Sequence, residues 1–255
     1  MKTSSTIESL LQDIGSAAFA LGHEIYLVGG YVRNQLMHDL RGKELKPCYD
    51  LDLVINCNAI EFTQKLQKYR QDNHPNHETF EVVEEFKQFG TVKIKDHNLP
   101  DYNIELASTR TETYDEPADF PKVTIIDSIK EDLQRRDFTI NALLESINPP
   151  KAKHPSGEIL DYVGGMSDIQ KGLIRVFHKY SFIDDPTRIY RAARFAAEYD
   201  FEIEPQTLEW MQAAMKDPQY PEWLEKRKNR FAIEMGKIKQ LKNAECALEL
   251  LGCGN

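Results

Sequence analysis

The stretch from Ile25 to Ile55 constrains the fold of this chain more than any other part of its sequence. It begins with the apolar run Ile25–Val28, which predicts a buried strand. Two glycines break that run, and a helix is expected to start within Tyr31–Leu36. A second apolar run, Leu51–Ile55, predicts a neighbouring strand. The rest of the chain is therefore expected to be arranged around these two strands.

The second strand carries two acidic residues, Asp50 and Asp52, in the sequence D-L-D. Residues two apart on a strand point to the same face, so both carboxylates would project together. Carboxylates held that close repel each other, and a hard divalent cation such as Mg²⁺ relieves the repulsion while sharing its coordination shell with phosphates. The alternative interpretation of the same pattern is a solvated strand edge with no ligand.

The glycine pair, Gly29 and Gly30, separates the first strand from the expected helix, and Arg33 follows shortly after it. Backbone N–H groups at a helix start suit an anionic phosphate, although a Gly-Gly pair is often only a turn. The combination of a phosphate-binding turn, an arginine and a carboxylate pair favours nucleotidyl transfer over either neutral interpretation.

Length and composition allow one large domain or two small ones, since 255 residues with 41% hydrophobic side chains can build a core. The net charge of −9 excludes a generally basic surface, so any contact with nucleic acid must come from a local basic patch. Four cysteines without C-x-x-C spacing indicate reduced thiols and a cytoplasmic protein. The N-terminus is typical of a capped helix rather than a signal peptide, and no apolar run is long enough for a membrane span.

Periodic patterns around the central stretch predict further elements of one sheet with helices. Helical periodicity covers residues 4–21 and 59–70. Alternating apolar and polar residues predict strands that extend the same sheet at residues 79–86, 91–95 and 103–107.

Two further sets of polar residues in this half are candidates for metal binding. Glu105 lies on the last of these strands, either as a third carboxylate on the metal side or as a solvent-facing residue. His74 and His77 form an H-x-x-H pair without an evident third ligand, so a solvated loop is favoured over a metal site there.

The segment that follows the sheet contains an acidic loop and a basic motif. Residues 114–121 read Y-D-E-P-A-D-F-P and predict a mobile loop. Asp137 is expected to cap a helix whose apolar side chains turn inward, namely Phe138, Ile140, Ala142 and Leu143. Arg136, together with Arg135, is either solvated or aimed at a triphosphate, where charge-assisted hydrogen bonds are strongest.

The sequence changes character at residues 145–165, where N-P-P, H-P-S-G and V-G-G mark turns around a short strand at 159–163. This change indicates a domain boundary. Beyond Asp168 the pattern is helical throughout, with helices that include residues 206–216 and 223–241.

One of these helices carries a row of basic residues. Asp185 is its expected N-cap, and Pro186 occupies the first helical position. Arg188, Arg191 and Arg194 follow at three-residue steps on one broad face. They form either a solvated face or a nucleotide contact, and the phosphate chemistry expected upstream favours the nucleotide.

Taken together, the motifs resemble the class II tRNA nucleotidyltransferase family, the CCA-adding enzymes, which share a polymerase-β-like head with bacterial poly(A) polymerases. The resemblance covers about residues 25–200, and its motifs occur in the family's order. They are L-V-G-G-Y-V-R with D-L-D, F-G-T-V, I-E-L-A-S-T-R-T-E-T-Y, R-R-D-F-T-I-N-A-L and D-D-P-T-R-I-Y-R-A-A-R-F. It implies an α+β head with a mixed sheet (residues 1–147) followed by an all-helical neck (residues 148–255).

The resemblance also implies roles for individual residues. Asp50 and Asp52 match the catalytic, metal-binding D-x-D, and Glu105 aligns with a segment that carries a third catalytic carboxylate in poly(A) polymerases. Asp185 and Arg188 resemble the amino-acid template that pairs with the incoming base. The other residues expected to bind the nucleotide are Gly29, Gly30, Arg33, Arg136, Arg191 and Arg194.

Two departures from the family pattern accompany these matches. Asn34 stands where the family usually has Asp after V-R, which weakens any charge role at that position. The helical body and tail that hold the tRNA in the family are expected to be absent from this chain.

The sequence therefore predicts an enzyme that adds nucleotides from CTP and ATP to the 3′ end of tRNA, with Mg²⁺ as cofactor and two metal ions in the mechanism. The enzymatic alternatives are a CC-adding or A-adding specialist and a poly(A) polymerase. A different kind of alternative is a catalytically degenerate nucleotide-binding module. No membrane partner is expected, and the oligomeric state stays open.

Overall fold

The computed structural model describes residues 7–45, 47–73, 80–97 and 99–253, which form two compact units. The first, here called the sheet unit, comprises Met1–Thr111, Val123–Arg135 and Asn141–Val163. The second, the helical unit, comprises Glu112–Lys122, Arg136–Ile140 and Gly164–Asn255. The interpretation of these units as a head and a neck stays a prediction.

A seven-stranded mixed sheet forms the centre of the sheet unit, with the strand order β3-β4-β5-β2-β1-β8-β9. Strands β2 and β5 are parallel, and every other neighbouring pair is antiparallel. The predicted α+β fold with a mixed sheet is therefore confirmed. The strands are β1 (Ile25–Val28), β2 (Asp50–Ile55), β3 (Phe80–Phe86), β4 (Thr91–Asp96), β5 (Asn103–Ser108), β8 (Leu144–Ser146) and β9 (Ile159–Leu160).

The residue pattern of the two inner strands explains their position. All four residues of β1 are buried, as expected of a strand covered on both faces. In β2 the residues alternate at its start: Leu51 and Leu53 are buried, while Asp50 and Asp52 are exposed. The middle strand of the sheet therefore begins with its two carboxylates on the open face.

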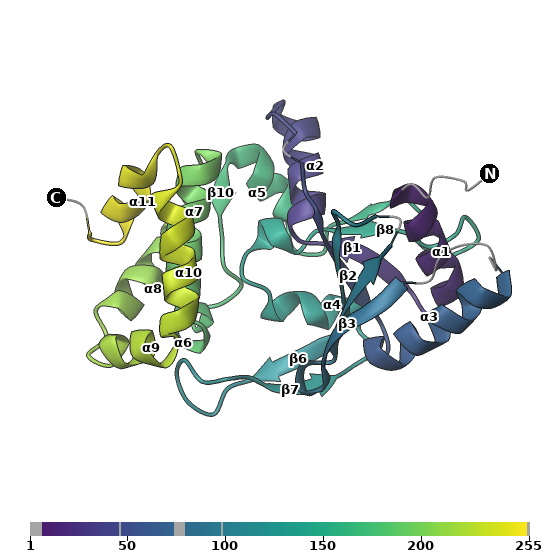
Figure 1. Cartoon of the computed structure of the whole chain (residues 1–255). Helices are drawn as coiled ribbons and strands as arrows, with labels where there is room; N and C mark the ends of the chain where they lie inside the picture. The colour runs from purple at the N-terminus through teal and green to yellow at the C-terminus, as the bar shows by residue number, and fades with distance from the viewer. Residues whose placement is uncertain (1–6, 46, 74–79, 98, 254–255) are drawn as a thin grey trace. The chain divides into compact units, whose positions relative to one another are not determined.

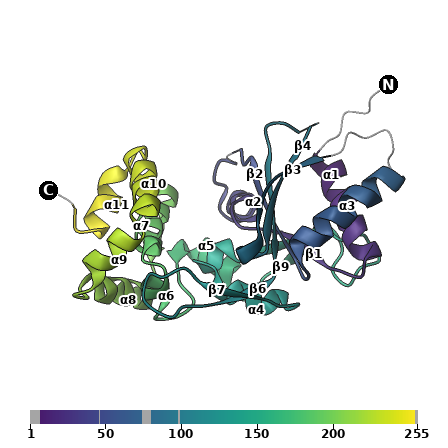
Figure 2. The ribbon, with the colours of Figure 1, turned by 60° about the horizontal axis from the view of Figure 1, so that its bottom comes forward.

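Helices cover both faces of this sheet. Helices α1 (Ile7–Ala20) and α3 (Ala59–Asn73) lie side by side on one face, and α2 (Gly30–Arg41) lies on the other (Figures 1 and 2). The helices predicted at 4–21 and 59–70 are confirmed within the described residues. Residues 4–6 and 79, and with them His74 and His77, lie outside the described part of the chain.

The segment after the sheet differs from the prediction. The short helix α4 (Ile129–Asp132) is followed by single 3₁₀ turns at Leu133–Arg135 and Thr139–Asn141, so the helix predicted after Asp137 is wrong. All four of its apolar residues are fully buried, as expected. However, 136–140 belongs to the helical unit and 141–163 to the sheet unit, so the segment passes from one unit to the other where the helix was predicted.

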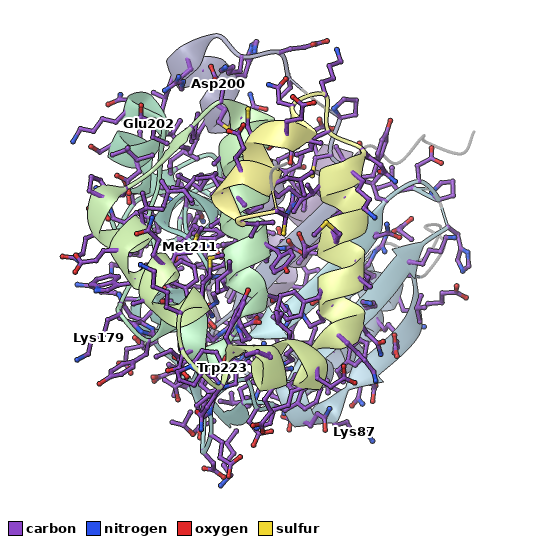
Figure 3. The ribbon with its side chains drawn as sticks, turned by 90° about the vertical axis from the view of Figure 1, so that its left-hand side faces the viewer. Lys87, Lys179, Asp200, Glu202, Met211 and Trp223 are labelled. Atoms are coloured by element: carbon purple, nitrogen blue, oxygen red, sulfur yellow. The ribbon has the colours of Figure 1, made fainter. Side chains whose placement is uncertain are left out.

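The helical unit adds a small feature to the predicted helices. Two-residue strands β10 (Leu173–Ile174) and β11 (Glu202–Ile203) pair in parallel, so the described residues beyond Asp168 contain this ladder in addition to helices and the loops between them. Met211 and Trp223 contribute buried side chains to the unit (Figure 3). Its helices are α5 (Gly165–Lys171), α6 (Ser181–Asp184), α7 (Thr187–Tyr199), α8 (Pro205–Met215), α9 (Tyr220–Lys226), α10 (Lys228–Lys239) and α11 (Ala244–Leu250).

The helix predicted over 223–241 is divided into α9 and α10 at Arg227. The backbone of Arg227 leaves helical geometry (φ −115°, ψ 17°), and its side chain donates to the carbonyl oxygens of Ala118, at 2.9 Å, and of Asp119. These bonds anchor the middle of the acidic loop 114–121. The loop connects β6 (Arg110–Thr113) with β7 (Lys122–Ile125), which pair as a separate two-stranded sheet.

The strand predicted at 159–163 is shorter than expected, because only Ile159–Leu160 pairs with β8. Across the described ranges, no helix is both long and apolar enough to cross a membrane.

Two helical glycines provide a matched test of the packing. A Cβ atom at Gly15 of α1 would overlap the carbonyl oxygen of Ile147, a backbone atom that cannot move freely, whereas a Cβ at Gly236 of α10 would meet nothing within 4 Å. Gly15→Ala should therefore destabilise the chain by about 1–3 kcal/mol. Gly236→Ala should stabilise it by about 0.5–1 kcal/mol, because alanine favours helix. Urea unfolding followed by circular dichroism measures both, and equal effects would contradict this packing.

Candidate active site

The predicted carboxylate pair lies at the start of the central strand. Asp50 and Asp52 are exposed on the same face of β2, and the parallel register places them opposite Asn103 and Glu105 of β5. The side-chain amide of Asn103 donates to Oδ1 of Asp50 at 2.9 Å. The polar side chains of these four residues therefore lie at the starts of two adjacent strands and point to the same face of the sheet.

The glycine turn packs directly against this pair. Gly29 has φ +79° and ψ −136°, a conformation that side-chain-bearing residues rarely adopt. A Cβ atom at this position would lie 3.0 Å from Oδ2 of Asp52, so the absence of a side chain lets the turn approach the carboxylate. Helix α2 begins at the next residue, Gly30, and its first N–H groups start beside Asp52. A phosphate bound by a metal at Asp52 would therefore meet a helix N-terminus.

Arg33 is held close to the same turn. Its side chain is only 7% exposed, and its Nη2 lies 3.6 Å from where a Cβ of Gly30 would be. Its Nη1 donates to Oδ1 of Asn141 at 2.6 Å, while Nε and Nη2 donate to Oδ1 of Asn34 at 3.2 and 2.9 Å. Both acceptors are neutral amides, so they orient the guanidinium without adding negative charge. Asn34, the departure from the family pattern, thus has a positioning contact.

Glu105 is half-buried beside Asp52, and burial, followed by the negative charge of Asp52, raises the pKa of its carboxyl group. Lys93, its cross-strand neighbour on β4, opposes this rise. Carboxyl groups crowded in this way are stabilised in their ionised form by a nearby cation. The environment of Glu105 is therefore compatible with the metal-side position that the sequence left open.

The residues present fit Mg²⁺. The described residues contain no group of three or more His, Cys, Asp or Glu side chains that could enclose a metal ion by themselves. Mg²⁺ does not require one, because it is usually bound through one or two carboxylates and completes its shell with water and substrate phosphates. Asp50 and Asp52 would supply the hard oxygen ligands, and no side chain at Gly29 stands between the turn and Asp52.

The helical unit holds a second cluster, centred on Asp185. This side chain is 8% exposed, and both of its oxygens are engaged. Oδ1 accepts from the backbone N and the hydroxyl of Thr187, at 3.1 and 2.5 Å, and Oδ2 accepts from Nη1 of Arg230 at 3.0 Å. Burial would raise the pKa of Asp185, but Arg230, the bonds from Thr187, and Arg188 outweigh it and lower the pKa below its ordinary value.

The start of α7 differs by one position from the prediction. The helix begins at Thr187, so Pro186 is its N-cap rather than its first residue, and Asp185 lies one residue further upstream. The capping bond still comes from Asp185, through the backbone N of Thr187. A structural role for Asp185 is therefore established by geometry, and any role in base choice must be tested beside it.

The arginines of α7 are packed rather than solvated. Arg188 is only 6% exposed. Arg191 is paired with Asp137 at 2.5 Å and with Glu234 at 3.4 Å. Arg194 is paired with Glu234 and Glu198, each at 2.8 Å. The nucleotide contacts predicted for these three residues stay predictions.

Arg136 and Asp137 lie in Arg136–Ile140, the part of the basic motif that belongs to the helical unit. Because Asp137 is paired with Arg191, this segment is fastened to α7, and Phe138 packs edge-to-face on Phe195 of the same helix. The sequence-predicted residues thus fall into two clusters: Gly29, Gly30, Arg33, Asp50, Asp52 and Glu105 in the sheet unit, and Arg136, Asp185, Arg188, Arg191 and Arg194 in the helical unit.

Sequence reasoning missed the residues that hold these side chains in place. Arg230 and Glu234 stand four residues apart in K-N-R-F-A-I-E-M, and Glu234 is 6% exposed although it is acidic. The sequence signal that could have found them is a helical Arg and Glu four residues apart, next to apolar residues. Asn103 and Asn141 gave no such signal, because their partners Asp50 and Arg33 are distant in the chain.

Comparison with known proteins identifies the family to which this chain belongs. The family model described as "Poly A polymerase head domain" matches residues 25–175. This match spans more than half of the chain and contains the glycine turn, both aspartates and Arg136. The chain therefore belongs to the poly A polymerase head domain family.

Similar proteins narrow the comparison. An A-adding tRNA nucleotidyltransferase of Aquifex aeolicus is 40% identical over 191 residues, which cover 74% of this chain but 20% of that protein. A solved structure of a CCA-adding enzyme in an apo form has a TM-score of 0.76 and 30% identity, covering 96% of this chain and 52% of that one. A tRNA nucleotidyltransferase solved with a primer tRNA and an incoming ATP analogue has a TM-score of 0.68 and 32% identity, covering 94% and 59%. The chain thus spans between a fifth and three fifths of these proteins.

Magnesium should stabilise the protein through the carboxylate pair. A ligand present at ten times its dissociation constant stabilises the folded state by about 1.4 kcal/mol, so MgCl₂ should raise the melting temperature of the parent chain above that seen in KCl of equal ionic strength. Asp52→Asn removes one ligand charge and should abolish the rise. Asp39→Asn, at an exposed position of α2, is the matched control and should keep it. An equal magnesium-dependent shift in Asp52→Asn would contradict the assignment.

Proposed function

We propose that this chain adds nucleotides from CTP and ATP to the 3′ end of tRNA. The observation that carries the proposal is the pair Asp50 and Asp52 on the central strand, directly against the glycine turn at Gly29. Membership of the poly A polymerase head domain family and the likeness to tRNA nucleotidyltransferases support the same reaction.

In this proposal the sheet unit binds the triphosphate and the reacting groups. The N–H groups of the turn at Gly29 and Gly30 would donate hydrogen bonds to the phosphate oxygens, and Arg33 would neutralise part of the phosphate charge from its fixed position. Two Mg²⁺ ions held by Asp50 and Asp52 would activate the 3′-hydroxyl and neutralise the departing pyrophosphate. Glu105 adds negative charge on the metal side of the strand.

The helical unit chooses the base. Asp185 offers only acceptor oxygens, since its lowered pKa keeps it ionised at neutral pH, and Arg188 offers only donors. Cytosine and adenine each present an amino donor beside a ring-nitrogen acceptor, so either base satisfies both side chains. Uracil and guanine place a carbonyl where the amino group stands. The unpaired buried acceptor costs on the order of 1–3 kcal/mol.

The remaining arginines act on the nucleotide side of this unit. Arg136, Arg191 and Arg194 supply positive charge for the nucleotide. Because Arg191 and Arg194 already carry carboxylate partners, their guanidinium groups are held in fixed orientations before any nucleotide arrives. The proposed compartment is the cytoplasm, and the free state of all four cysteines supports a reducing environment.

A second candidate is an A-adding specialist, which would accept ATP alone. The 40% identity to the Aquifex aeolicus A-adding enzyme favours it, whereas the structural likeness to a CCA-adding enzyme favours addition of both nucleotides.

The experiment that tests both candidates supplies labelled CTP or ATP with tRNAs that lack one, two or three terminal nucleotides. Full CCA addition predicts that all three acceptors are completed. An A-adding specialist would extend only the tRNA that lacks one nucleotide, and would use ATP alone. Absence of any incorporation in the presence of magnesium would contradict the proposal.

Base choice has its own test. Asp185→Asn keeps the capping ability of the side chain, because Asn caps a helix about as well as Asp, but its amide can also donate. The variant should therefore fold normally and admit UTP or GTP roughly 5- to 150-fold better than the parent does, which corresponds to the penalty of an unpaired acceptor. Incorporation of all four nucleotides measures this ratio.

The matched control is Asp217→Asn in the same unit, where the aspartate accepts from the backbone N of Gln219 and Asn can do the same. It should reject UTP and GTP as the parent does. If Asp185→Asn and Arg188→Ala also reject them as strongly as the parent, base choice does not reside in these two residues.

A further inference from the structure

Two tyrosines stand immediately before the carboxylate-bearing ends of β2 and β5. Tyr49 precedes Asp50, and Tyr102 precedes Asn103, its partner in the parallel register. The backbone N of Asn103 donates to the carbonyl of Tyr49 at 2.8 Å, which extends the pairing of the strands by one step. Their rings meet edge-to-face, with centroids 5.7 Å apart and an interplanar angle of 61°.

This pair is a partly exposed aromatic surface close in the chain to the proposed reacting groups. Tyr49 is 51% exposed although its ring packs on that of Tyr102. Both tyrosines directly precede the first residues of β2 and β5, so the rings lie at the starts of the two strands that carry the carboxylates. An RNA end whose 3′-hydroxyl reaches the carboxylates would bring its terminal base to the same end of the sheet.

The surrounding charge makes stacking an appropriate way to bind RNA at this position. The chain carries a net charge of −9, and Asp50, Asp52 and Glu105 add negative potential where an RNA end must arrive. Without bound metal ions, this negative potential repels the phosphates of the RNA acceptor. A ring binds a base through its face, without charge, and every base offers such a face.

We propose that Tyr49 and Tyr102 form a stacking surface for the terminal base of the RNA acceptor. The proposal rests on the function proposed above and names the acceptor contact of the same site. Stacking tolerates any base, which suits an acceptor whose last nucleotide changes after each addition. The base of the incoming nucleotide is instead chosen by hydrogen bonds at Asp185 and Arg188, which a ring face cannot provide.

The test compares two kinds of substitution. Tyr49→Ala removes the ring and should raise the KM for the acceptor at least fivefold, since base–aromatic stacking is worth about 5- to 150-fold in affinity. The KM for the nucleotide should stay within twofold of the parent value. Tyr49→Phe and Tyr102→Phe keep the rings and should behave as the parent. Loss in the Phe variants equal to that in the Ala variant would show that the hydroxyl matters instead of the ring.

The matched control is Tyr162→Ala, another exposed tyrosine of the sheet unit, at 43% exposure, which should leave both KM values unchanged. Melting curves verify that each variant is folded. If Tyr49→Ala raises only the KM for the nucleotide, the rings bind the incoming base and the proposal is overturned. Unchanged KM values for both substrates in Tyr49→Ala would also overturn it.

A measurement of RNA binding tests the stacking proposal independently of nucleotide addition. The dissociation constant of a fluorescently labelled single-stranded RNA ending in C-C, measured by anisotropy, should rise at least fivefold in Tyr49→Ala and not in Tyr162→Ala. A parent chain that binds this RNA but adds no nucleotide would contradict the proposed function, and the ratio of the dissociation constants would still decide the role of the rings. Equal dissociation constants would refute stacking even if the parent is active.

Discussion

Repulsion among carboxylates at the start of the central strand is the constraint on which the site depends. The parallel register of β2 and β5 sets Asp52 beside Glu105, and their proximity contributes to the raised pKa of Glu105. Such an arrangement is unfavourable by itself, and the fold maintains it because Leu51, Leu53 and Ile104 anchor the same strands in the core. A cation that relieves the repulsion would therefore bind to a site that the hydrophobic core has already shaped.

The glycine turn belongs to the same constraint. Gly29 adopts a positive φ and lies where a side chain would press on Asp52, so its single hydrogen lets the start of α2 face the carboxylate. Arg33, oriented by two amides, brings fixed positive charge to the same turn. In the helical unit the signs of the charges are opposite. Asp185 is a buried carboxylate surrounded by arginines, and these arginines lower its pKa. One cluster suits a cation and phosphates, and the other suits a neutral base with a donor and an acceptor.

Much of this arrangement could be predicted from the sequence, because it follows from short-range patterns. The alternation of D-L-D-L placed two carboxylates on one face, and Gly-Gly between a strand and a helix marked the turn. The corrections to two of the predicted helices share a physical cause. The residues after Asp137 pass from the helical unit to the sheet unit, and Arg227 leaves helical geometry while its side chain bonds to the carbonyl oxygen of Ala118. Helical periodicity cannot report contacts between residues that are distant in the chain.

The residues that position the site were hidden for the same reason. Asn103, Asn141 and Arg230 form hydrogen bonds to Asp50, Arg33 and Asp185, over 45 to 108 residues of chain. The Tyr49–Tyr102 pair was equally invisible, since the two rings meet only when β2 and β5 are paired in register.

The central claim is that Asp50 and Asp52 act as catalytic metal ligands in nucleotidyl transfer. The most direct measurement is incorporation of labelled CTP and ATP by Asp50→Asn and Asp52→Asn, with melting curves recorded on the same samples and Asp101→Asn, at an exposed position just before β5, as control. The account predicts that both site variants melt as the parent does and lose all measurable incorporation, while the control stays active. Near-parental incorporation by either folded site variant would contradict it.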